Sequence, residues 1–384
     1  MKKILLIFGT RPEAIKLAPV ILKLRAKSKE LRTIVCVTAQ HREMLDQVLD
    51  IFQIKPDYDL GIMKQNQSLF DVTVNGLKKL EGILKKEKPD IILVQGDTTT
   101  TFIASLAAYY LKIKIGHIEA GLRTKDKFNP FPEEINRRLT DCLADLYFVH
   151  TKQAKENLLR EGVDKKKIFV TGNTVIDALM MIVKKQNNKR IQKEIKQKFI
   201  LNYGISLDNK KLILVTGHRR ESFGIDFENI CKGLKKIALK NQDIQIIYPV
   251  HLNPNVQKPV RKILSGIKNV HLIEPLDYFT FVWLMNRAYL ILTDSGGIQE
   301  EAPSLGKPVL VMRKKTERTE GIDAGTAKLV GTDSEKIYSE AKELLENIRL
   351  YQKMAQAVNP YGDGKAAERI VEHLAYYDAL LGER

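Results

Sequence analysis

Short apolar runs alternate with amphipathic stretches along most of the chain. In the first half, six apolar runs have the length of buried strands: residues 4–8, 33–38, 91–95, 115–118, 146–150 and 168–171. Between them, apolar residues recur at helical spacing, as at Leu17, Val20, Ile21 and Leu24. Strands and helices in alternation are typical of βαβ units, which build a parallel sheet with helices on both faces.

A polar stretch at residues 184–198 interrupts this alternation, and its charge indicates that it buries little surface. The alternation then restarts, with apolar runs at 212–216, 244–250, 270–274, 290–293 and 308–312. We therefore predict two doubly wound, Rossmann-like α/β domains, residues 1–172 and 173–364. The last helix, within 365–384, could pack back on the first domain. Such folds bind ligands at the carboxyl ends of their strands, so we expect a ligand in a cleft between the domains.

Length and composition agree with two globular domains. The 384 residues exceed what a single hydrophobic core usually serves, and 44% apolar with 28% charged residues is typical of a folded chain. The longest apolar runs are too short to span a membrane, and the run near the N-terminus is too short for a secretory signal. The three cysteines are scattered, which favours neither disulfides nor a thiolate zinc site. We predict a cytoplasmic protein.

The formal charge of +17 raises the question of an anionic partner. The lysines concentrate at residues 85–88, 165–167 and 184–198, in segments that resemble solvated helix faces or loops, and no nucleic-acid-binding motif accompanies them. Neither a GxGxxG nor a P-loop motif is present, and the seven histidines are dispersed. We therefore predict a lysine-rich surface with no nucleic-acid partner, no membrane partner and no metal.

The first polar motif follows the first predicted strand. Residues 9–16 read GTRPEAIK, in which Pro12 suits the first turn of a helix. The free N–H groups of that helix, together with Arg11 and Lys16, would form a seat for a pyrophosphate. The alternative is an ordinary capped helix with exposed basic residues.

Carboxylates gather after the next strands. Asp97 lies in QGDTTTT at 95–101, Glu119 in HIEAGLR at 117–123, and Glu133 in PFPEEINRR at 130–138. Each has an ordinary structural explanation, since aspartate caps helices and acidic residues favour the first helical turn. Together, however, they map to one rim of one sheet. Neighbouring carboxylates raise one another's pKa and suit proton transfer.

The second half repeats this arrangement. His218 follows a strand within GHRRESFG at 217–224, where it could bind a phosphate or transfer a proton. Residues 292–301 read LTDSGGIQEE, a strand, a glycine-rich turn and a helix. The backbone N–H groups of that turn can bind phosphate, and Glu301 can reach ribose hydroxyls.

These motifs together carry a resemblance to a known family. The segments are residues 9–16, 39–42, 96–101, 116–124, 172–174, 216–221, 248–254, 295–301 and 359–364. In this order they resemble the non-hydrolysing UDP-N-acetylglucosamine 2-epimerases of bacteria, over essentially the whole chain. The resemblance implies a glycosyltransferase B-type fold, a cytoplasmic homodimer and an isomerase with no redox cofactor or catalytic metal. The implied reaction interconverts UDP-N-acetylglucosamine and UDP-N-acetylmannosamine and supplies cell-surface polysaccharide synthesis.

The resemblance also implies roles for individual residues. Asp97, Glu119 and Glu133 are then the acid/base candidates, and His218 lies near the phosphates or the C1 oxygen. The implied substrate contacts are Arg11, Lys16, Arg137, Phe281, Ser295, Gly296, Gly297, Glu301 and Arg318. The implied contacts of a second, activating UDP-N-acetylglucosamine are Gln40, Gln67, Arg219 and His251. Asn66 stands where related sequences can have an arginine at that activating site.

Three other functions remain open from the sequence. A hydrolysing epimerase would share much of this pattern but release free N-acetylmannosamine. A B-type glycosyltransferase would share the fold and Glu301 but would not need carboxylates on both sides of the sugar C2. A non-catalytic binder of nucleotide sugar or RNA would explain the charge but not the clustered acids.

Overall fold

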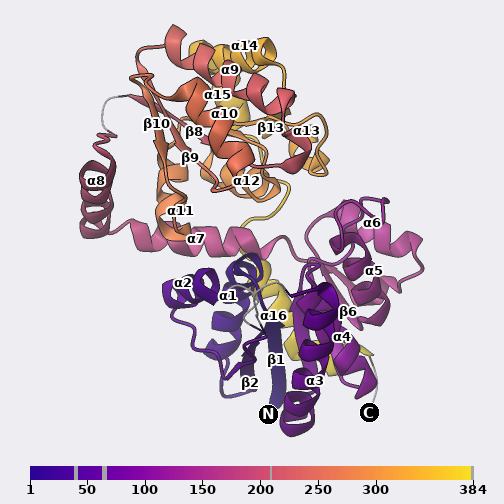
Figure 1. Cartoon of the computed structure of the whole chain (residues 1–384). Coiled ribbons are helices and arrows are strands. Elements are labelled where there is room, and N and C mark those ends of the chain that lie inside the picture. Colours follow the sequence, from indigo (N-terminus) through magenta and orange to yellow (C-terminus); the bar gives the residue numbers. More distant parts are fainter. Residues whose placement is uncertain (39–41, 63–66, 208–209, 382–384) are drawn as a thin grey trace. The chain divides into compact units, whose positions relative to one another are not determined.

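The computed structural model describes residues 1–38, 42–62, 67–207 and 210–381. The chain divides into two compact units (Figure 1): Met1–Ala178 with Gly362–Arg384, and Leu179–Tyr361. The sequence placed the first division at 172/173. The division in the structure falls inside one continuous helix, α7 (Thr174–Gln186), so no break in the sequence pattern marks it.

The first unit is built around a parallel sheet of seven strands in the order β3-β2-β1-β4-β5-β6-β7. Its strands are β1 (Lys2–Phe8), β2 (Leu31–Val37), β3 (Tyr58–Asp59), β4 (Ile91–Gln95), β5 (Lys114–Ile118), β6 (Leu146–Val149) and β7 (Ile168–Val170). β4 is fully buried and β1 is buried from Ile4 to Phe8, as their continuous apolar runs predict. The strand order reverses between β1 and β4, which makes a topological switch point there.

Helices connect these strands in turn. They are α1 (Arg11–Ala26), α2 (Arg42–Phe52), α3 (Leu69–Glu87), α4 (Thr99–Tyr110), α5 (Glu133–Leu143), α6 (Lys152–Arg160) and a short turn at Lys165–Lys167. The last helix of the chain, α16 (Ala366–Leu381), belongs to this unit and contacts α1. Asp177 of α7 accepts hydrogen bonds from the backbone N–H groups of Ala366 and Ala367 at 3.1 and 2.9 Å. This carboxylate therefore caps the start of α16.

The second unit repeats the design with six parallel strands in the order β10-β9-β8-β11-β12-β13. The strands are β8 (Lys211–Thr216), β9 (Ile244–Pro249), β10 (Val270–Ile273), β11 (Leu290–Thr293), β12 (Val309–Val311) and β13 (Ala327–Leu329). Its longer helices are α8 (Lys189–Tyr203), α9 (Ile225–Lys240), α10 (Pro254–Leu264), α11 (Tyr278–Arg287), α14 (Ser334–Glu346) and α15 (Ile348–Ala355). The short ones are α12 (Gly296–Glu301) and α13 (Thr319–Asp323), with turns at Arg220–Ser222 and Ala302–Leu305. Its switch point lies between β8 and β11, so the predicted class of two doubly wound α/β domains is confirmed.

Most of the charged stretch at 184–198 is exposed or half-buried, as its composition predicts. It continues into α8, whose residues Ile195 and Phe199 are buried. The Phe199 ring stacks on Trp283 of α11 with 5.6 Å between the ring centroids. The prediction of a largely solvated segment is confirmed, and a narrow apolar stripe at Ile195 and Phe199 is enough to anchor this otherwise basic helix.

Among the described residues, no helix is both long and apolar enough to cross a membrane.

The α8 anchor yields a stability prediction. Phe199→Ala should lower the free energy of unfolding of the second unit by about 3–5 kcal/mol, because it leaves a cavity against Trp283. Leu201→Ala on the same helix is the control, since Leu201 is 82% exposed and its loss should change stability by less than about 0.5 kcal/mol. Trp283 is the only tryptophan in the sequence, so its fluorescence during urea unfolding reports this region. Equal losses in both variants would contradict the anchoring role.

Candidate active site

Four of the predicted motifs lie at the two switch points. In the first unit, the loops after β1 and β4 carry the motifs at 9–16 and 95–101. In the second unit, the loops after β8 and β11 carry those at 217–224 and 292–301. Ligands of doubly wound sheets bind where these loops diverge, because the helix N-termini and the loop side chains converge there.

A buried carboxylate ties the two loops of the first unit together. Glu13 of α1 accepts hydrogen bonds from the backbone N–H groups of Gly9 and Thr10, from the Thr10 hydroxyl, and from the hydroxyls of Thr98 and Thr101. Burial raises the pKa of Glu13 above its ordinary value, against the opposing effect of these hydrogen bonds. The loop after β1 and the start of α4 are thereby fixed to one another.

The turn after β1 is also closely packed. A Cβ atom on Gly9 would lie 2.0 Å from the Thr38 hydroxyl oxygen and 2.7 Å from that of Thr100. These two hydroxyls are 2.9 Å apart and hydrogen-bonded. Only glycine fits at this position, which explains the start of the GTRPEAIK motif.

Asp97 lies at the end of β4 and is paired with a cation. Its carboxylate forms an ion pair with Arg137 of α5, and its backbone carbonyl accepts a hydrogen bond from the Asn136 side chain at 3.0 Å. Arg137 also lies 3.5 Å from a carboxylate oxygen of Glu134. Asp97 is therefore fixed by α5 at the carboxyl edge of the sheet while one quarter of its side chain stays exposed.

Glu119 lies at the end of the neighbouring strand, β5, and pairs with Lys16 of α1. Its backbone φ is +68°, in the left-handed region that non-glycine residues rarely adopt. Backbone N–H groups of Glu119 and Ala120 donate to the Phe148 carbonyl of β6 at 2.9 and 3.3 Å, which holds the turn in place. A strained residue whose side chain bears a charge is typical of functional sites.

Glu133 is the first residue of α5, the same helix that supplies Arg137. Within the described residues, Glu133 Oε2 and Arg137 Nε are buried polar atoms with no hydrogen-bond partner. Buried polar atoms are normally paired, so this end of α5 is suited to a polar ligand. The structure thus pairs Asp97 with Arg137 and Glu119 with Lys16. Glu133 lies on α5, the helix that carries Arg137.

In the second unit, Asp294 organises the switch point. This fully buried carboxylate follows β11 and accepts hydrogen bonds from the backbone N–H groups of His218 and Arg219 at 2.7 and 2.8 Å. His218 Nδ1 lies 3.5 Å from Asp294 Oδ1. The His218 ring stacks on His251, with centroids 5.4 Å apart and planes inclined by 17°.

A pocket opens beside the stacked rings. It is lined by His218, Arg219, Arg220, Glu221, His251 and Asn253. Burial lowers the pKa of His218, and the nearby charges of Arg219 and His251 lower it further, whereas Asp294 and Glu221 oppose this. The imidazole is therefore suited to stay neutral near pH 7 and to accept or donate a proton.

The predicted nucleotide side forms a second group in this unit. Gly296 and Gly297 begin α12 after Ser295, and a Cβ atom on Gly296 would lie 3.2 Å from the Arg318 guanidinium carbon. Glu301 ends α12 and accepts a hydrogen bond from Tyr278 of α11 at 3.2 Å. Phe281 lies one turn further along α11.

Acidic neighbours fix the guanidinium of Arg318. Arg318 Nε donates to Glu300 at 3.0 Å and Nη1 to Glu317 at 2.9 Å. Asn359, from the NPYGDG break, donates to the Glu300 carbonyl at 2.9 Å. The segments at 295–301, 317–318 and 359–364 are therefore joined by hydrogen bonds.

The structure describes three of the four residues that are expected to bind an activator. Gln40 lies outside the described residues, as does Asn66. Gln67 of the first unit donates to the Ile62 carbonyl at 2.7 Å. Arg219 and His251 line the His218 pocket of the second unit.

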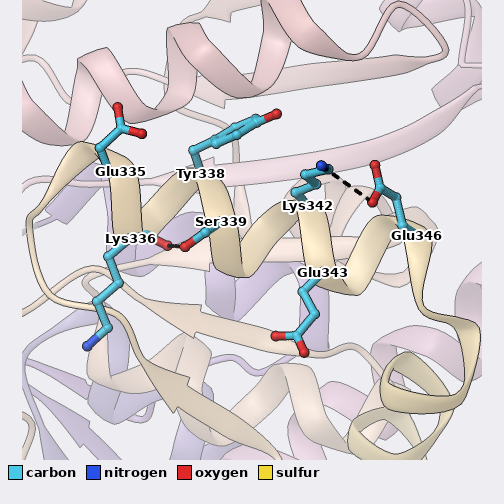
Figure 2. A pocket seen from close by; sticks show the side chains of 7 residues that line it. All are labelled: Glu335, Lys336, Tyr338, Ser339, Lys342, Glu343 and Glu346. Carbon is cyan, nitrogen blue, oxygen red and sulfur yellow. Dashed lines mark hydrogen bonds and ion pairs between the residues drawn. The ribbon is translucent and has the colours of Figure 1, made fainter.

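A different hollow runs along α14 and has none of these features (Figure 2). It is lined by Glu335, Lys336, Tyr338, Ser339, Lys342, Glu343 and Glu346. Lys342 and Glu346 form a surface ion pair across one turn at 3.8 Å, and the Ser339 hydroxyl donates to the Lys336 carbonyl. The hollow lies on the flank of α14 beside α9, where Lys236 of α9 pairs with Glu335 and lies over the Tyr338 ring. Within the described ranges, no three His, Cys, Asp or Glu side chains are grouped as metal ligands would be.

Several buried residues that position the site are not marked by any pattern in the sequence. Glu13 and Asp294 are buried acids that fix the loops, and His117, Asp141 and Arg123 form a buried charged cluster beneath Asp97 and Glu119. Glu13 and His117 lie within the recognised motifs, but nothing in their spacing shows that their side chains point inward. Asp141 lies on a helix whose pattern does not distinguish it from a surface residue.

Two doubly wound sheets with charged groups at both switch points define an enzyme of the class that binds nucleotide-linked substrates. The family model described as UDP-N-acetylglucosamine 2-epimerase matches residues 23–375. The chain therefore belongs to the UDP-N-acetylglucosamine 2-epimerase family, a family of isomerases, as the motifs predict.

Relatives and solved structures agree over the full length. The chain is 57% identical to the UDP-N-acetylglucosamine 2-epimerase of Salmonella typhimurium, covering 99% of this chain and all of the relative. It is 54% identical to the Neisseria meningitidis enzyme solved with UDP-GlcNAc, with a TM-score of 0.90 over 97% of this chain and 99% of that one. The Methanocaldococcus jannaschii enzyme, solved with UDP-GlcNAc and UDP, is 36% identical with a TM-score of 0.79 over 97% and 99%. These neighbours confirm the predicted glycosyltransferase B-type fold.

The His218 environment makes a titration prediction. The NMR titration midpoint of His218 should lie below about 6.5, the ordinary value for histidine. Arg219→Gln removes a positive charge that lowers the pKa, so the midpoint should rise. Arg220→Gln, on the neighbouring exposed residue, is the matched control and should leave the midpoint in place. An unchanged midpoint in the Arg219 variant would show that the charge of Arg219 does not lower the pKa of His218.

Proposed function

We propose that this protein interconverts UDP-N-acetylglucosamine and UDP-N-acetylmannosamine by eliminating UDP to a glycal and adding it back, without releasing free sugar. The observation that carries the proposal is the pair of carboxylates Asp97 and Glu119. They lie at the carboxyl ends of neighbouring strands, and each is beside a cation from a different helix.

The chemistry explains why two such groups are needed. Carbon C2 of the sugar is not next to a carbonyl, so its proton is not acidic enough for direct removal. Breaking the C1–O bond builds positive charge at C1 and makes the C2 proton removable. One group must take that proton on one face and another must deliver a proton on the opposite face. Asp97 and Glu119 are the candidates for these two steps, with Glu133 as a third acid/base group.

The cations that pair with these carboxylates can also stabilise the departing UDP. Lys16 and Arg137 form ion pairs with the two carboxylates, and they can transfer their interaction to the departing phosphate as charge moves. Arg11, at the first position of α1, adds a positive charge at a helix N-terminus, which favours an anion.

The second unit supplies groups for UDP. The backbone N–H groups at Gly296 and Gly297 and the Ser295 hydroxyl suit a phosphate, and the carboxylate of Glu301 suits the ribose hydroxyls. Arg318 and Phe281 complete this side. His218, neutral near pH 7, can give a proton to the leaving phosphate oxygen or orient it.

We also propose that the protein acts as a cytoplasmic homodimer that supplies activated N-acetylmannosamine for cell-surface polysaccharides. Support comes from the bacterial epimerases that the whole chain resembles. Gel filtration with light scattering, which measures the mass in solution, tests the dimer directly.

A labelling experiment tests the reaction. During turnover of UDP-N-acetylglucosamine in heavy water, deuterium should enter C2 of both epimers, because the abstracting groups exchange their protons with solvent. Proton NMR follows the C2 signal and the appearance of UDP-N-acetylmannosamine. Epimer formed without label would contradict elimination. Free N-acetylmannosamine as the main product would instead identify a hydrolysing epimerase, and sugar transfer to an acceptor a glycosyltransferase.

Two amide variants complete the same experiment. Asp97→Asn and Glu119→Gln should lower both epimerisation and C2 labelling by about 10²–10⁴-fold, because each removes an acid/base group. UDP binding, measured by calorimetry, should stay nearly intact, whereas Arg11→Ala should weaken it. Near wild-type turnover in both amide variants would reduce these carboxylates to structural roles.

We further propose activation by a second molecule of UDP-N-acetylglucosamine. Support comes from the family resemblance, which implies that Gln40, Gln67, Arg219 and His251 contact the activator. Asn66 stands where related sequences can have an arginine, so we expect the activation to be weak.

Kinetics test this activation. We expect sigmoidal dependence on UDP-N-acetylglucosamine, and a slow reverse reaction from UDP-N-acetylmannosamine until a trace of the other epimer is added. His251→Ala should make the dependence of the rate on UDP-N-acetylglucosamine hyperbolic without abolishing turnover. Hyperbolic kinetics in both directions, unchanged in this variant, would contradict the second site.

A further inference from the structure

A buried histidine beneath the predicted acid/base groups has both of its ring nitrogens engaged. His117 is the fourth residue of β5 and its side chain is fully buried. Its Nε2 lies 2.7 Å from the carbonyl oxygen of Gly96, and its Nδ1 lies 2.6 Å from Asp141 Oδ1. A carbonyl oxygen can only accept a hydrogen bond, so Nε2 carries a proton.

The second nitrogen also faces an acceptor. Asp141 accepts a hydrogen bond from the Gly121 N–H at 3.1 Å, and Arg123 Nη1 lies 2.8 Å from the same carboxylate oxygen. A guanidinium and a backbone N–H that both face this carboxylate favour its ionised form, independently of His117. An ionised carboxylate leaves Nδ1 as the donor, so the geometry favours a doubly protonated, positively charged His117.

This ion pair holds the backbone on both sides of the predicted active carboxylates. Gly96, which accepts from His117, directly precedes Asp97, and Gly121, which donates to Asp141, is two residues after Glu119. Gly121 has φ +81°, and a Cβ atom there would lie 2.4 Å from the Ala154 carbonyl oxygen, so this turn has little freedom.

The pair also joins these turns to a helix. Asp141 belongs to α5, which begins at Glu133 and supplies the Arg137 partner of Asp97. Arg123 extends the cluster to Glu161 with two hydrogen bonds of 2.7 and 2.6 Å. Asp97, Glu119 and Glu133 are thus carried by three segments that meet at one buried cluster.

We propose that His117 is a positioning residue that acts as an imidazolium and, with Asp141, fixes the separation of the Asp97 and Glu119 carboxylates. His117 has no part in proton transfer to the sugar. This inference rests on the proposed epimerisation, because it assigns Asp97 and Glu119 to opposite faces of the same C2. Proton transfer depends steeply on distance, so loss of this constraint should slow chemistry more than binding.

A spectroscopic measurement on the wild-type protein tests the charge. With histidine ¹⁵N-labelled in its ring, His117 should show two protonated ring nitrogens at about pH 7.5, where an unperturbed histidine is mostly neutral. His117→Gln, if folded, assigns the signals by their disappearance. A single protonated nitrogen on every buried histidine would overturn the imidazolium. This readout requires neither substrate nor activity.

Kinetics test the positioning. His117→Gln can donate to one partner only, and Asp141→Asn removes the charge that holds Nδ1, so each should lower kcat by about 10²-fold. The KM and the UDP dissociation constant should change little, and calorimetric UDP binding gives the number of folded sites, to which kcat is referred. His373→Gln is the matched control, since His373 lies in the same unit and packs on Phe169 at 4.1 Å.

The outcomes separate the two proposals. Wild-type kcat per folded site in both variants would overturn the positioning role while leaving the epimerase assignment intact. Absence of C2 labelling in the wild-type enzyme would overturn the epimerase assignment while leaving the imidazolium measurable. Should His117→Gln fail to fold, Asp141→Asn and the wild-type spectrum still decide the matter.

Discussion

The pairing of charges at the carboxyl edge of the first sheet is the constraint on which the site depends. Carboxylates that are taken out of water lose hydration, and they stay ionised there only when cations or several donors replace it. Asp97 has Arg137, Glu119 has Lys16, and Glu13 has a ring of hydroxyl and N–H donors. Each partner comes from a different segment, so pairing the charges also joins the loops.

In the second unit, a single buried carboxylate, Asp294, joins the loops at the switch point. It accepts two backbone N–H groups from the opposite loop. Glu13 accepts two backbone N–H groups from its own loop and two threonine hydroxyls from the opposite loop. In both units, one buried carboxylate thus joins the loops after the two central strands. The sheets therefore present rigid loops to a ligand, which is what an enzyme needs to hold reacting groups at fixed distances.

Much of the architecture follows from local pattern. The strands at β4 and β11 were placed to the residue, because a continuous apolar run bounded by polar turns has few other interpretations. The two-residue β3 and the three-residue β13 were missed, since short edge strands bury too little to leave a pattern. Helix α8 is largely solvated as its charges predict, and the two buried residues Ile195 and Phe199 suffice to anchor it.

The sequence by itself determined the fold class, the family and the motifs at the ends of the strands, because alternating apolar runs and turn residues are local properties. Only the tertiary structure decided which carboxylate pairs with which lysine or arginine. Lys16 meets Glu119 and Arg137 meets Asp97 only because α1 and α5 return to neighbouring strands of one sheet. His117 and Asp141 are 24 residues apart, and neither type of side chain is expected to be buried until its partner is known. Pairing across such separations is a property of the folded chain, and no spacing in the sequence encodes it.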